Sequence, residues 1–280
     1  MADYVLTFSC PDRPGLVHAV SSWLVDLNGN ILDSDQFRDD TTERFFMRVH
    51  FEAPDDLPAL NQTFIPTAGA MNMDWQIWPT ARRPRVLMLV SKIDHCLADL
   101  LYRRRIGELK IDMPLIASNH RDAYPLAAAH DVDFLHLPVS PETKSQQEAR
   151  LLDEVRARDI DFVVLARYMQ ILSAEFCAAL TGRIINIHHS FLPGFKGARP
   201  YHQAHERGVK LIGATAHYVT ADLDDGPIIE QDVERVDHRM SADQLAAVGR
   251  DIERVVLAKA VRYQSEHRIL LNGNRTVVFT

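Results

Sequence analysis

Along the first 80 residues, apolar positions recur with the spacing of a strand in some segments and with the spacing of a helix in others. Tyr4–Phe8 is predicted as a strand, and from Leu16 to Leu27 apolar residues recur at helical spacing until Asn28-Gly29-Asn30 ends the helix. Two strands around a polar turn, a helix-like piece and a last strand follow, with the strands at Ile31–Arg38, Arg44–Glu52 and Trp75–Trp78. The order βαββαβ predicts a ferredoxin-like domain over residues 1–80.

A polar stretch bracketed by two prolines, Pro79–Pro84, cannot continue a helix or a central strand and predicts a linker. Beyond it, the apolar run Arg85–Val90 is typical of a buried strand, and apolar runs alternate with helical segments. Later strands are expected at Ile111–Ile116, Phe134–Val139, Asp161–Leu165, Ile184–Ile187 and Ile212–Val219, and helices near 95–107, 121–130, 145–158, 173–180 and 241–267. This alternation predicts a second, Rossmann-like domain over residues 85–280, with a mostly parallel sheet.

Short-range signals mark where individual elements of the second domain begin and turn. Ser145 with Glu148, and Ser241 with Gln244, have the spacing of a capping box at the start of a helix. Asn272-Gly273 lies between two apolar runs, which predicts a hairpin over residues 269–278. The chain is therefore expected to be an α/β protein that ends in a long helix and a hairpin.

Composition and charge narrow the class of protein. A length of 280 residues, with 46% hydrophobic and 25% charged residues, fits two globular domains and no membrane span. No secretory signal is apparent and the three cysteines are scattered, so the chain is expected to be cytoplasmic and free of disulfides. The net charge of -7, with the one compact basic patch Arg103–Arg105 lacking aromatic neighbours, argues against a nucleic-acid partner.

Polar side chains with the chemistry of acyl transfer lie in the predicted strand that starts at Ile184. Alternation along a strand places Asn186 and His188 on one side, near the carboxyl end where α/β sheets bind ligands. An amide donor can stabilise an oxyanion and an imidazole can transfer a proton. A carboxylate is still needed, and Asp224 and Asp225 supply two candidates after the strand at 212–219. The irregular loop 190–197 is expected to shape the pocket.

These residues lie within motifs that resemble the formyltransferase family that uses 10-formyltetrahydrofolate. The motifs are N-I-H-H-S-F-L-P-G-F-K-G at 186–197, Y-H-Q-A at 201–204, G-A-T-A-H-Y-V at 213–219, L-D-D-G-P-I-I at 223–229, and the segments 116–119 and 165–169. The resemblance implies that Asn186, His188 and Asp224 are catalytic. It also implies that folate binds along the 165–172 and 219–225 loops, at Arg167, Tyr168, Met169, Ile171, Leu172, His217, Val219 and Asp225.

The N-terminal segment, with Cys10-Pro-Asp-Arg-Pro-Gly15 after its first strand, resembles an ACT domain. Such domains commonly bind small amino acids or pair with copies of themselves, which implies an amino-acid effector and a homo-oligomer. An ACT-like module, a linker and a formyltransferase-like domain in this order resemble the members of the family that hydrolyse the formyl group. The implied reaction converts 10-formyltetrahydrofolate to formate and tetrahydrofolate, for one-carbon and purine metabolism, with no tightly bound cofactor.

Two departures from the transferases favour hydrolysis over transfer. The segment Ser91–Cys96 after the first strand of the second domain has no glycine, whereas a backbone cradle for a phosphorylated acceptor needs one. His189 stands where the resembled transferases have proline, so that water can replace the amine. The alternatives left open are formyl transfer to a small amine such as glycinamide ribonucleotide and, more weakly, an amino-acid-sensing binding protein; initiator tRNA is the least favoured acceptor.

Each candidate residue also has a plainer interpretation. Asn186 and His188 can be a hydrogen-bonded polar pair at a strand end, and Asp224 and Asp225 can be turn residues. The remaining histidines lack the spacing of a zinc site, so no metal is expected. Cys96, beside His95, is expected to be a small buried thiol because adjacent helical residues do not face each other.

Overall fold

The computed structural model describes residues 1–192, 194 and 200–280. Part of the predicted pocket loop, Pro193 and Phe195–Gly197, lies outside the described residues. The chain divides into two units, Met1–Arg83 with Glu266–Thr280, and Pro84–Ser265. The division near Pro84 falls at the end of the predicted proline-bracketed linker.

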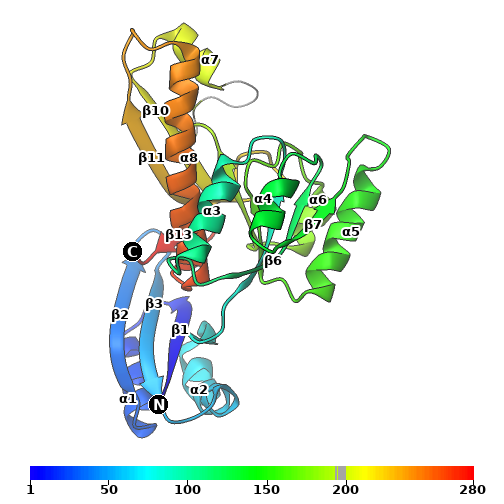
Figure 1. Cartoon of the computed structure of the whole chain (residues 1–280). Coiled ribbons are helices and arrows are strands. Elements are labelled where there is room, and N and C mark those ends of the chain that lie inside the picture. Colours follow the sequence, from blue (N-terminus) through cyan, green and yellow to red (C-terminus); the bar gives the residue numbers. More distant parts are fainter. Residues whose placement is uncertain (193, 195–199) are drawn as a thin grey trace. The chain divides into compact units, whose positions relative to one another are not determined.

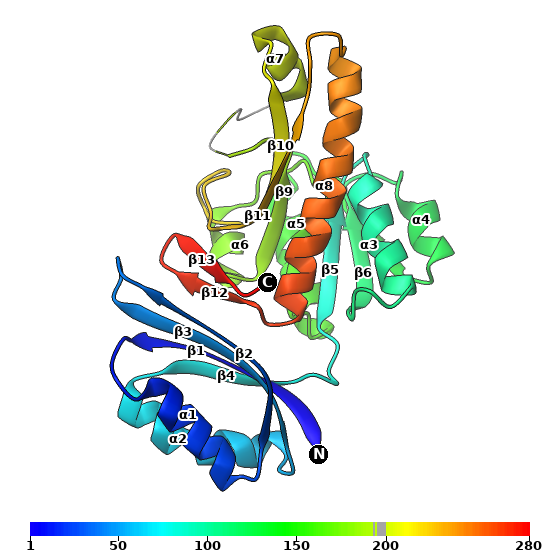
Figure 2. The ribbon, with the colours of Figure 1, turned by 90° about the vertical axis from the view of Figure 1, so that its left-hand side faces the viewer.

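The first unit contains a four-stranded antiparallel sheet with the order β2-β3-β1-β4. Its strands are β1 (Ala2–Pro11), β2 (Asn30–Asp39), β3 (Arg44–Ala53) and β4 (Asp74–Pro79), and its helices are α1 (Leu16–Asp26) and α2 (Leu57–Met71). Figure 2 shows both helices on the same face of the sheet. Between them and the sheet lies an aromatic core in which the rings of Trp23 and Phe64 are 4.6 Å apart. The predicted βαββαβ order is confirmed.

The predicted C-terminal hairpin is present as β12 (Ile269–Asn272) and β13 (Arg275–Val278), but it belongs to the first unit. The carboxylate of Asp39 accepts hydrogen bonds from Asn272 Nδ2 at 2.6 Å and from Arg275 at 2.8 Å. The ring of His267 stacks on Trp78 with centroids 4.3 Å apart. Polar and aromatic groups of the first unit therefore hold the hairpin, whereas the predicted second domain, residues 85–280, includes it.

The second unit contains a seven-stranded sheet with the order β11-β10-β9-β8-β5-β6-β7. Strands β5 to β9 run parallel: β5 (Arg85–Val90), β6 (Asp112–Ser118), β7 (Asp133–His136), β8 (Phe162–Leu165) and β9 (Ile184–His188). Strands β10 (Leu211–Tyr218) and β11 (Ile228–Arg235) extend the sheet in antiparallel pairing. The expected mostly parallel α/β sheet is confirmed, and β11 is a strand that sequence periodicity did not predict.

Among its described residues, the second unit contains six helices: α3 (His95–Arg105), α4 (Tyr124–Ala129), α5 (Lys144–Ala157), α6 (Ala174–Ala179), α7 (Pro200–Arg207) and α8 (Ala242–Ser265). Figure 1 shows the long helix α8 alongside β10 and β11 and next to α3. At its start, Ser241 and Gln244 form the predicted reciprocal capping box, with bonds of 2.8 and 3.3 Å.

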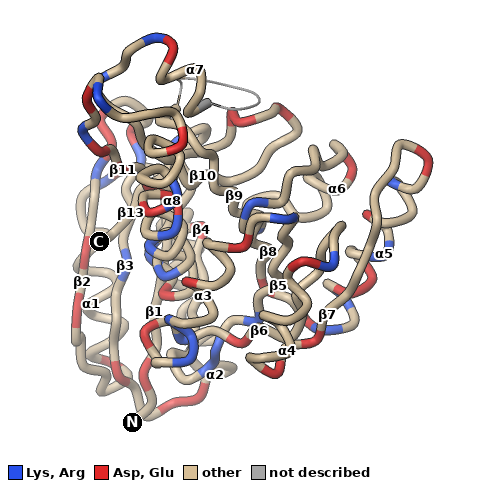
Figure 3. Tube along the Cα trace, turned by 45° about the horizontal axis from the view of Figure 1, so that its top comes forward, with Lys and Arg blue, Asp and Glu red and all other residues tan. Residues whose placement is uncertain are grey.

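The capping box predicted at Ser145 is absent. Helix α5 begins one residue earlier, at Lys144, after a turn in which Ser140 and Thr143 bond to each other, and Glu148 instead accepts from the backbone N–H of Ser173 at 3.0 Å. Along both units, basic and acidic residues are interspersed on the trace (Figure 3). No helix in the described part of the chain is long and apolar enough to cross a membrane.

Candidate active site

The pairing of three neighbouring strands brings the polar residues of the second unit together. In the parallel pair β8 and β9, Leu165 lies opposite Asn186, and in the antiparallel pair β9 and β10, His217 lies opposite Asn186 and Thr215 opposite His188. Asn186 and His188 share one side of β9, as alternation predicts. The site therefore forms at the carboxyl end of β9, where the following chain leaves the sheet.

The loop between β10 and β11 carries Asp224 back to this point. The backbone N–H of Tyr218 donates to the carbonyl of Pro227 at 2.9 Å, which closes the loop. A Cβ atom at Gly226 would lie 1.7 Å from the carbonyl oxygen of Tyr218, so this close approach requires glycine. Asp224 itself has a φ of 54°, a left-handed conformation that costs free energy in a residue other than glycine. Backbone strain of this kind is common at functional sites, where it holds a side chain in one particular orientation.

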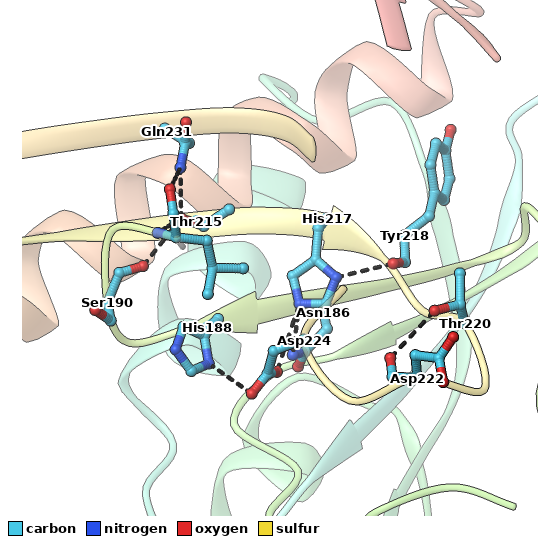
Figure 4. A network of polar contacts seen from close by, with 11 residues as sticks. Asn186, His188, Ser190, Thr215, His217, Tyr218, Thr220, Asp222, Asp224 and Gln231 are labelled. Atoms are coloured by element: carbon cyan, nitrogen blue, oxygen red, sulfur yellow. Dashed lines mark hydrogen bonds and ion pairs between the residues drawn. The ribbon is translucent and has the colours of Figure 1, made fainter. Parts of the chain in front are cut away.

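Asp224 and His188 form a buried carboxylate–imidazole pair. Asp224 Oδ2 lies 3.3 Å from His188 Nδ1, and the two side chains are 9% and 4% exposed (Figure 4). Burial by itself raises the pKa of Asp224, but the hydrogen bond and charge of His188 and the charge of His217 outweigh it, so the pKa of Asp224 is lowered. The carboxylate is therefore ionised at neutral pH and can stabilise a charged imidazole.

His217 links Asn186 to the same aspartate. Its Nε2 lies 3.2 Å from Asn186 Nδ2 and 3.8 Å from Asp224 Oδ1, and its Nδ1 lies 2.8 Å from the carbonyl oxygen of Tyr218. Figure 4 shows its ring between these groups. Burial lowers the pKa of His217, since only 2% of the residue is exposed.

A cavity of about 240 Å³ opens over these side chains. Its wall is formed by the segment after β8, by β9 and by the loop after β10, and includes Leu165, Arg167, Tyr168, Met169, Gln170, Ile171, Leu172, Asn186, Ile187, His188, His189, His217, Val219, Thr220, Ala221, Asp222, Leu223 and Asp224. The sequence-predicted catalytic and folate-binding residues are all in this wall except Asp225, which is exposed and lies outside it.

Ser91 holds the segment after β8 in place. Its Oγ accepts a hydrogen bond from the backbone N–H of Met169 at 2.9 Å and donates to Asn119 Oδ1 at 2.7 Å, while its own N–H donates to the carbonyl of Arg167 at 3.2 Å. Arg167 has a φ of 66°. The hydroxyl and the backbone N–H of Ser91, the first residue of the glycine-free segment 91–96, thus both form hydrogen bonds that fix the cavity wall.

A buried cluster around Glu253 of α8 lies behind Arg167. Glu253, 1% exposed, accepts from Tyr201 Oη at 2.6 Å, lies 2.9 Å from His95 Nε2 and pairs with Arg167 Nε at 3.5 Å. Burial alone raises its pKa, but the hydrogen bond from His95 and the charge of Arg167 outweigh this and lower the pKa of Glu253. Sequence reasoning missed this residue; the only signal was an acidic residue among the apolar positions of a long helix.

His95, Cys96 and Glu253 have ligand atoms within 4.8 Å of one another. The oxygens of Glu253 already face Tyr201, His95 and the guanidinium of Arg167, and burial raises the pKa of the Cys96 thiol well above its usual value. A cation would compete with Arg167 for the same carboxylate and with a proton for the sulfur. These residues therefore fit a hydrogen-bonded cluster better than a metal centre.

The fold and this polar site define a formyl transferase domain joined to an ACT domain. The formyl transferase family model matches residues 84–261, and the ACT domain model matches residues 4–64. A formyltetrahydrofolate deformylase of Synechocystis sp. is 50% identical over 277 residues, 98% of this chain and 97% of that protein. The chain belongs to the formyltetrahydrofolate deformylase family.

Solved structures agree with this placement. The crystal structure of formyltetrahydrofolate deformylase from Burkholderia mallei is 55% identical, with a TM-score of 0.96, and the match covers 100% of both chains. A glycinamide ribonucleotide transformylase from Symbiobacterium toebii is 31% identical with a TM-score of 0.67, covering 74% of this chain and 97% of that one. The similarity therefore extends over the whole chain for the deformylase and over part of it for the transformylase.

Proposed function

We propose that this enzyme hydrolyses 10-formyltetrahydrofolate to formate and tetrahydrofolate, and that Asn186, His188 and Asp224 are its catalytic residues. The observation that carries the proposal is the buried pair of His188 and Asp224, 3.3 Å apart, beside the amide of Asn186 in the wall of one cavity. A proton-transferring pair and an amide donor are the groups that attack of water on a formyl carbon requires. Family membership supports the choice of substrate.

In the proposed reaction, His188 takes a proton from the attacking water while Asp224 stabilises the resulting imidazolium. The formyl carbon becomes tetrahedral and its oxygen becomes an oxyanion, which accepts a hydrogen bond from the Asn186 amide. His188 then returns the proton to the folate nitrogen as the carbon–nitrogen bond breaks. Formic acid leaves and loses its own proton to solvent, so one water is consumed for each formate and tetrahydrofolate formed.

The folate is proposed to lie against Arg167, Tyr168, Met169, Ile171, Leu172, His217 and Val219, whose side chains or backbone line the cavity. Met169 and Ile171 are 57% and 62% exposed, so a flat pterin ring can cover apolar surface there. Because Asp225 is not in the wall, its proposed part in folate binding is limited to the outer end of the loop.

We further propose that the enzyme is a cytoplasmic homo-oligomer without a tightly bound cofactor, in which the ACT domain binds a small amino-acid effector. The ACT match at residues 4–64 supports a ligand-binding or assembly role for the first unit. Formate release measured with each common amino acid in turn, together with the mass of the protein in solution, tests both parts. An unaltered rate with every amino acid would contradict the effector.

Transfer to an amine is the second candidate, favoured by the partial likeness to a glycinamide ribonucleotide transformylase. Incubating the purified protein with 10-formyltetrahydrofolate, with and without glycinamide ribonucleotide, distinguishes hydrolysis from transfer. We expect formate to appear at the same rate in both mixtures and no formylated amine to form, with Asn186→Ala as the control for contaminating hydrolysis. Formate release only when the amine is present, or formylated amine as the main product, would overturn hydrolysis.

A further inference from the structure

We propose that His217 is a positioning residue that holds the Asn186 amide in the orientation needed for hydrolysis, and that it does so only as a neutral imidazole. This inference rests on the proposed function, since it assigns Asn186 to the oxyanion. His217 is on β10, directly opposite Asn186 on β9, so the contact is set by the pairing of the two strands. Substrate contact is not required for this role.

The hydrogen bonds of His217 define where its proton lies. Nδ1 is 2.8 Å from the carbonyl oxygen of Tyr218. A carbonyl oxygen can only accept, so Nδ1 must carry the proton, and in a neutral imidazole Nε2 is then an acceptor. The strand itself therefore selects one of the two neutral forms of the ring.

That choice determines how the Asn186 amide is oriented. Nε2 of His217, as an acceptor, can be satisfied by the Asn186 Nδ2 group at 3.2 Å, but would repel the amide oxygen if the side chain were rotated by half a turn. One N–H of the amide is bound to His217, and the second remains to donate to the formyl oxygen in the cavity. Without His217, both amide orientations would be accessible and part of the population would present an oxygen to the oxyanion.

Protonation of His217 would reverse this arrangement. The charged ring has donors at both nitrogens and cannot accept from Asn186. The charged or titratable groups that face the ring are Asp224 on the loop after β10, whose Oδ1 is 3.8 Å from Nε2, and His188 on β9. A charged His217 would therefore donate to Oδ1 of Asp224, share that carboxylate with His188 and release Asn186. Burial opposes the protonation of His217, as a charge on His188 would, while the hydrogen bond to the Tyr218 carbonyl and the charge of Asp224 favour it.

Two substitutions at His217 distinguish the roles of its two ring nitrogens. In His217→Asn, the shorter amide can still donate to the Tyr218 carbonyl but offers no acceptor to Asn186. In His217→Gln, the longer side chain can place an oxygen near the position of Nε2. We expect His217→Asn to lower kcat by about tenfold to a hundredfold with little change in KM for the folate, and His217→Gln to recover most of the loss. His238→Asn, an exposed histidine of the same unit, is the matched control.

A double-mutant cycle tests whether His217 acts through Asn186. In an Asn186→Ala background, adding His217→Asn should reduce kcat by less than about threefold, because the group that it holds is gone. If the two losses multiply, or if His217→Gln is as slow as His217→Asn, the positioning role is wrong. Should His217→Asn not fold, the pH profile of His217→Gln decides, since its acid-side loss of kcat must be less steep than that of the parent once one titrating group has been removed. A parent enzyme that releases no formate would instead contradict the proposed function.

Discussion

Tyr201 donates a hydrogen bond of 2.6 Å to Glu253, and both residues are buried. The Tyr201 phenol passes over α8 at Gly249, the one residue of that helix without a side chain, to reach the carboxylate. A Cβ atom at Gly249 would lie 2.0 Å from the Tyr201 ring. Burial and the charge of Glu253 raise the pKa of Tyr201, so the phenol stays protonated as the donor. The cluster behind Arg167 therefore depends on a glycine four positions away from its carboxylate.

Gly249→Ala is expected to destabilise the second unit by about 2 kcal/mol or more, because displacing a buried ring outweighs the gain of about 1 kcal/mol in helix propensity. Gly69 of helix α2 is the matched control, since no atom lies within 4 Å of its would-be Cβ. Gly69→Ala should leave stability unchanged or raise it. Denaturant unfolding of both variants measures the difference, and equal effects would contradict the packing role of Gly249.

The two neighbouring aspartates of the active-site loop are expected to respond very differently to the same change. Asp224→Asn removes the charge 3.3 Å from His188 and should lower turnover by about a thousandfold, as loss of an acid–base partner does. Asp225→Asn changes an exposed carboxylate outside the cavity wall and should stay within about tenfold of the parent. Single-turnover hydrolysis by both variants is the measurement; a larger loss at Asp225 would refute the placement.

Asn186→Ala is expected to lower turnover by about a hundredfold or more while folate binding survives. The amide is proposed to act on the oxyanion, which exists only during the reaction, so its removal should appear in kcat and leave the dissociation constant of the folate nearly unchanged. Equilibrium binding and steady-state rates, measured on the same preparation, test this. Near-normal turnover would exclude the oxyanion role.

Acid is expected to destabilise the folded protein through His189. Burial first, and then the positive charge of Arg167 and His188, lowers its pKa from 6.5 to about 4. Between these two values the unfolded chain takes up a proton that the folded protein does not, so the free energy of unfolding falls as pH decreases from about 6.5 to about 4, by up to ~3 kcal/mol. Above this window His189 is neutral in both states and contributes no pH dependence.

The comparison that checks this is the unfolding free energy of His189→Asn against that of the parent across the same pH range. The variant should lose part of the acid dependence, because the asparagine does not titrate. His238→Asn, which changes an exposed histidine, should keep the slope of the parent. A slope that is identical in all three proteins would show that His189 does not have a lowered pKa.

Much of the fold could be predicted from periodicity and turn residues. The strand Arg85–Val90 is found with the same bounds as predicted, and the βαββαβ order of the first unit is correct. The strand β11 was missed because its exposed edge position leaves polar residues at most sites, so the apolar alternation is weak. The grouping of the hairpin with the first unit could not be predicted for a different reason: contacts between residues as far apart as Asp39 and Asn272 leave no local pattern.

The candidate site was predictable to a smaller extent. Alternation places Asn186 and His188 on one face, and the motif resemblance selected Asp224, which does lie beside His188. The orientation of His217 and the cluster at Glu253 depend on which strand and helix lie alongside, and this is set by the antiparallel β10 and by Gly249. Such pairings are properties of the tertiary structure and have no short-range signal.

The hairpin that completes the first unit affects the order in which the protein can fold during synthesis. Residues Glu266–Thr280 leave the ribosome after all of Pro84–Ser265, yet they belong with Met1–Arg83. The second unit, which is continuous in sequence, is therefore synthesised in full while the first unit still lacks two donors to Asp39. A chain that ends before Asn272 would contain the whole second unit, with the proposed active site, but would lack both donors to Asp39 of the first unit.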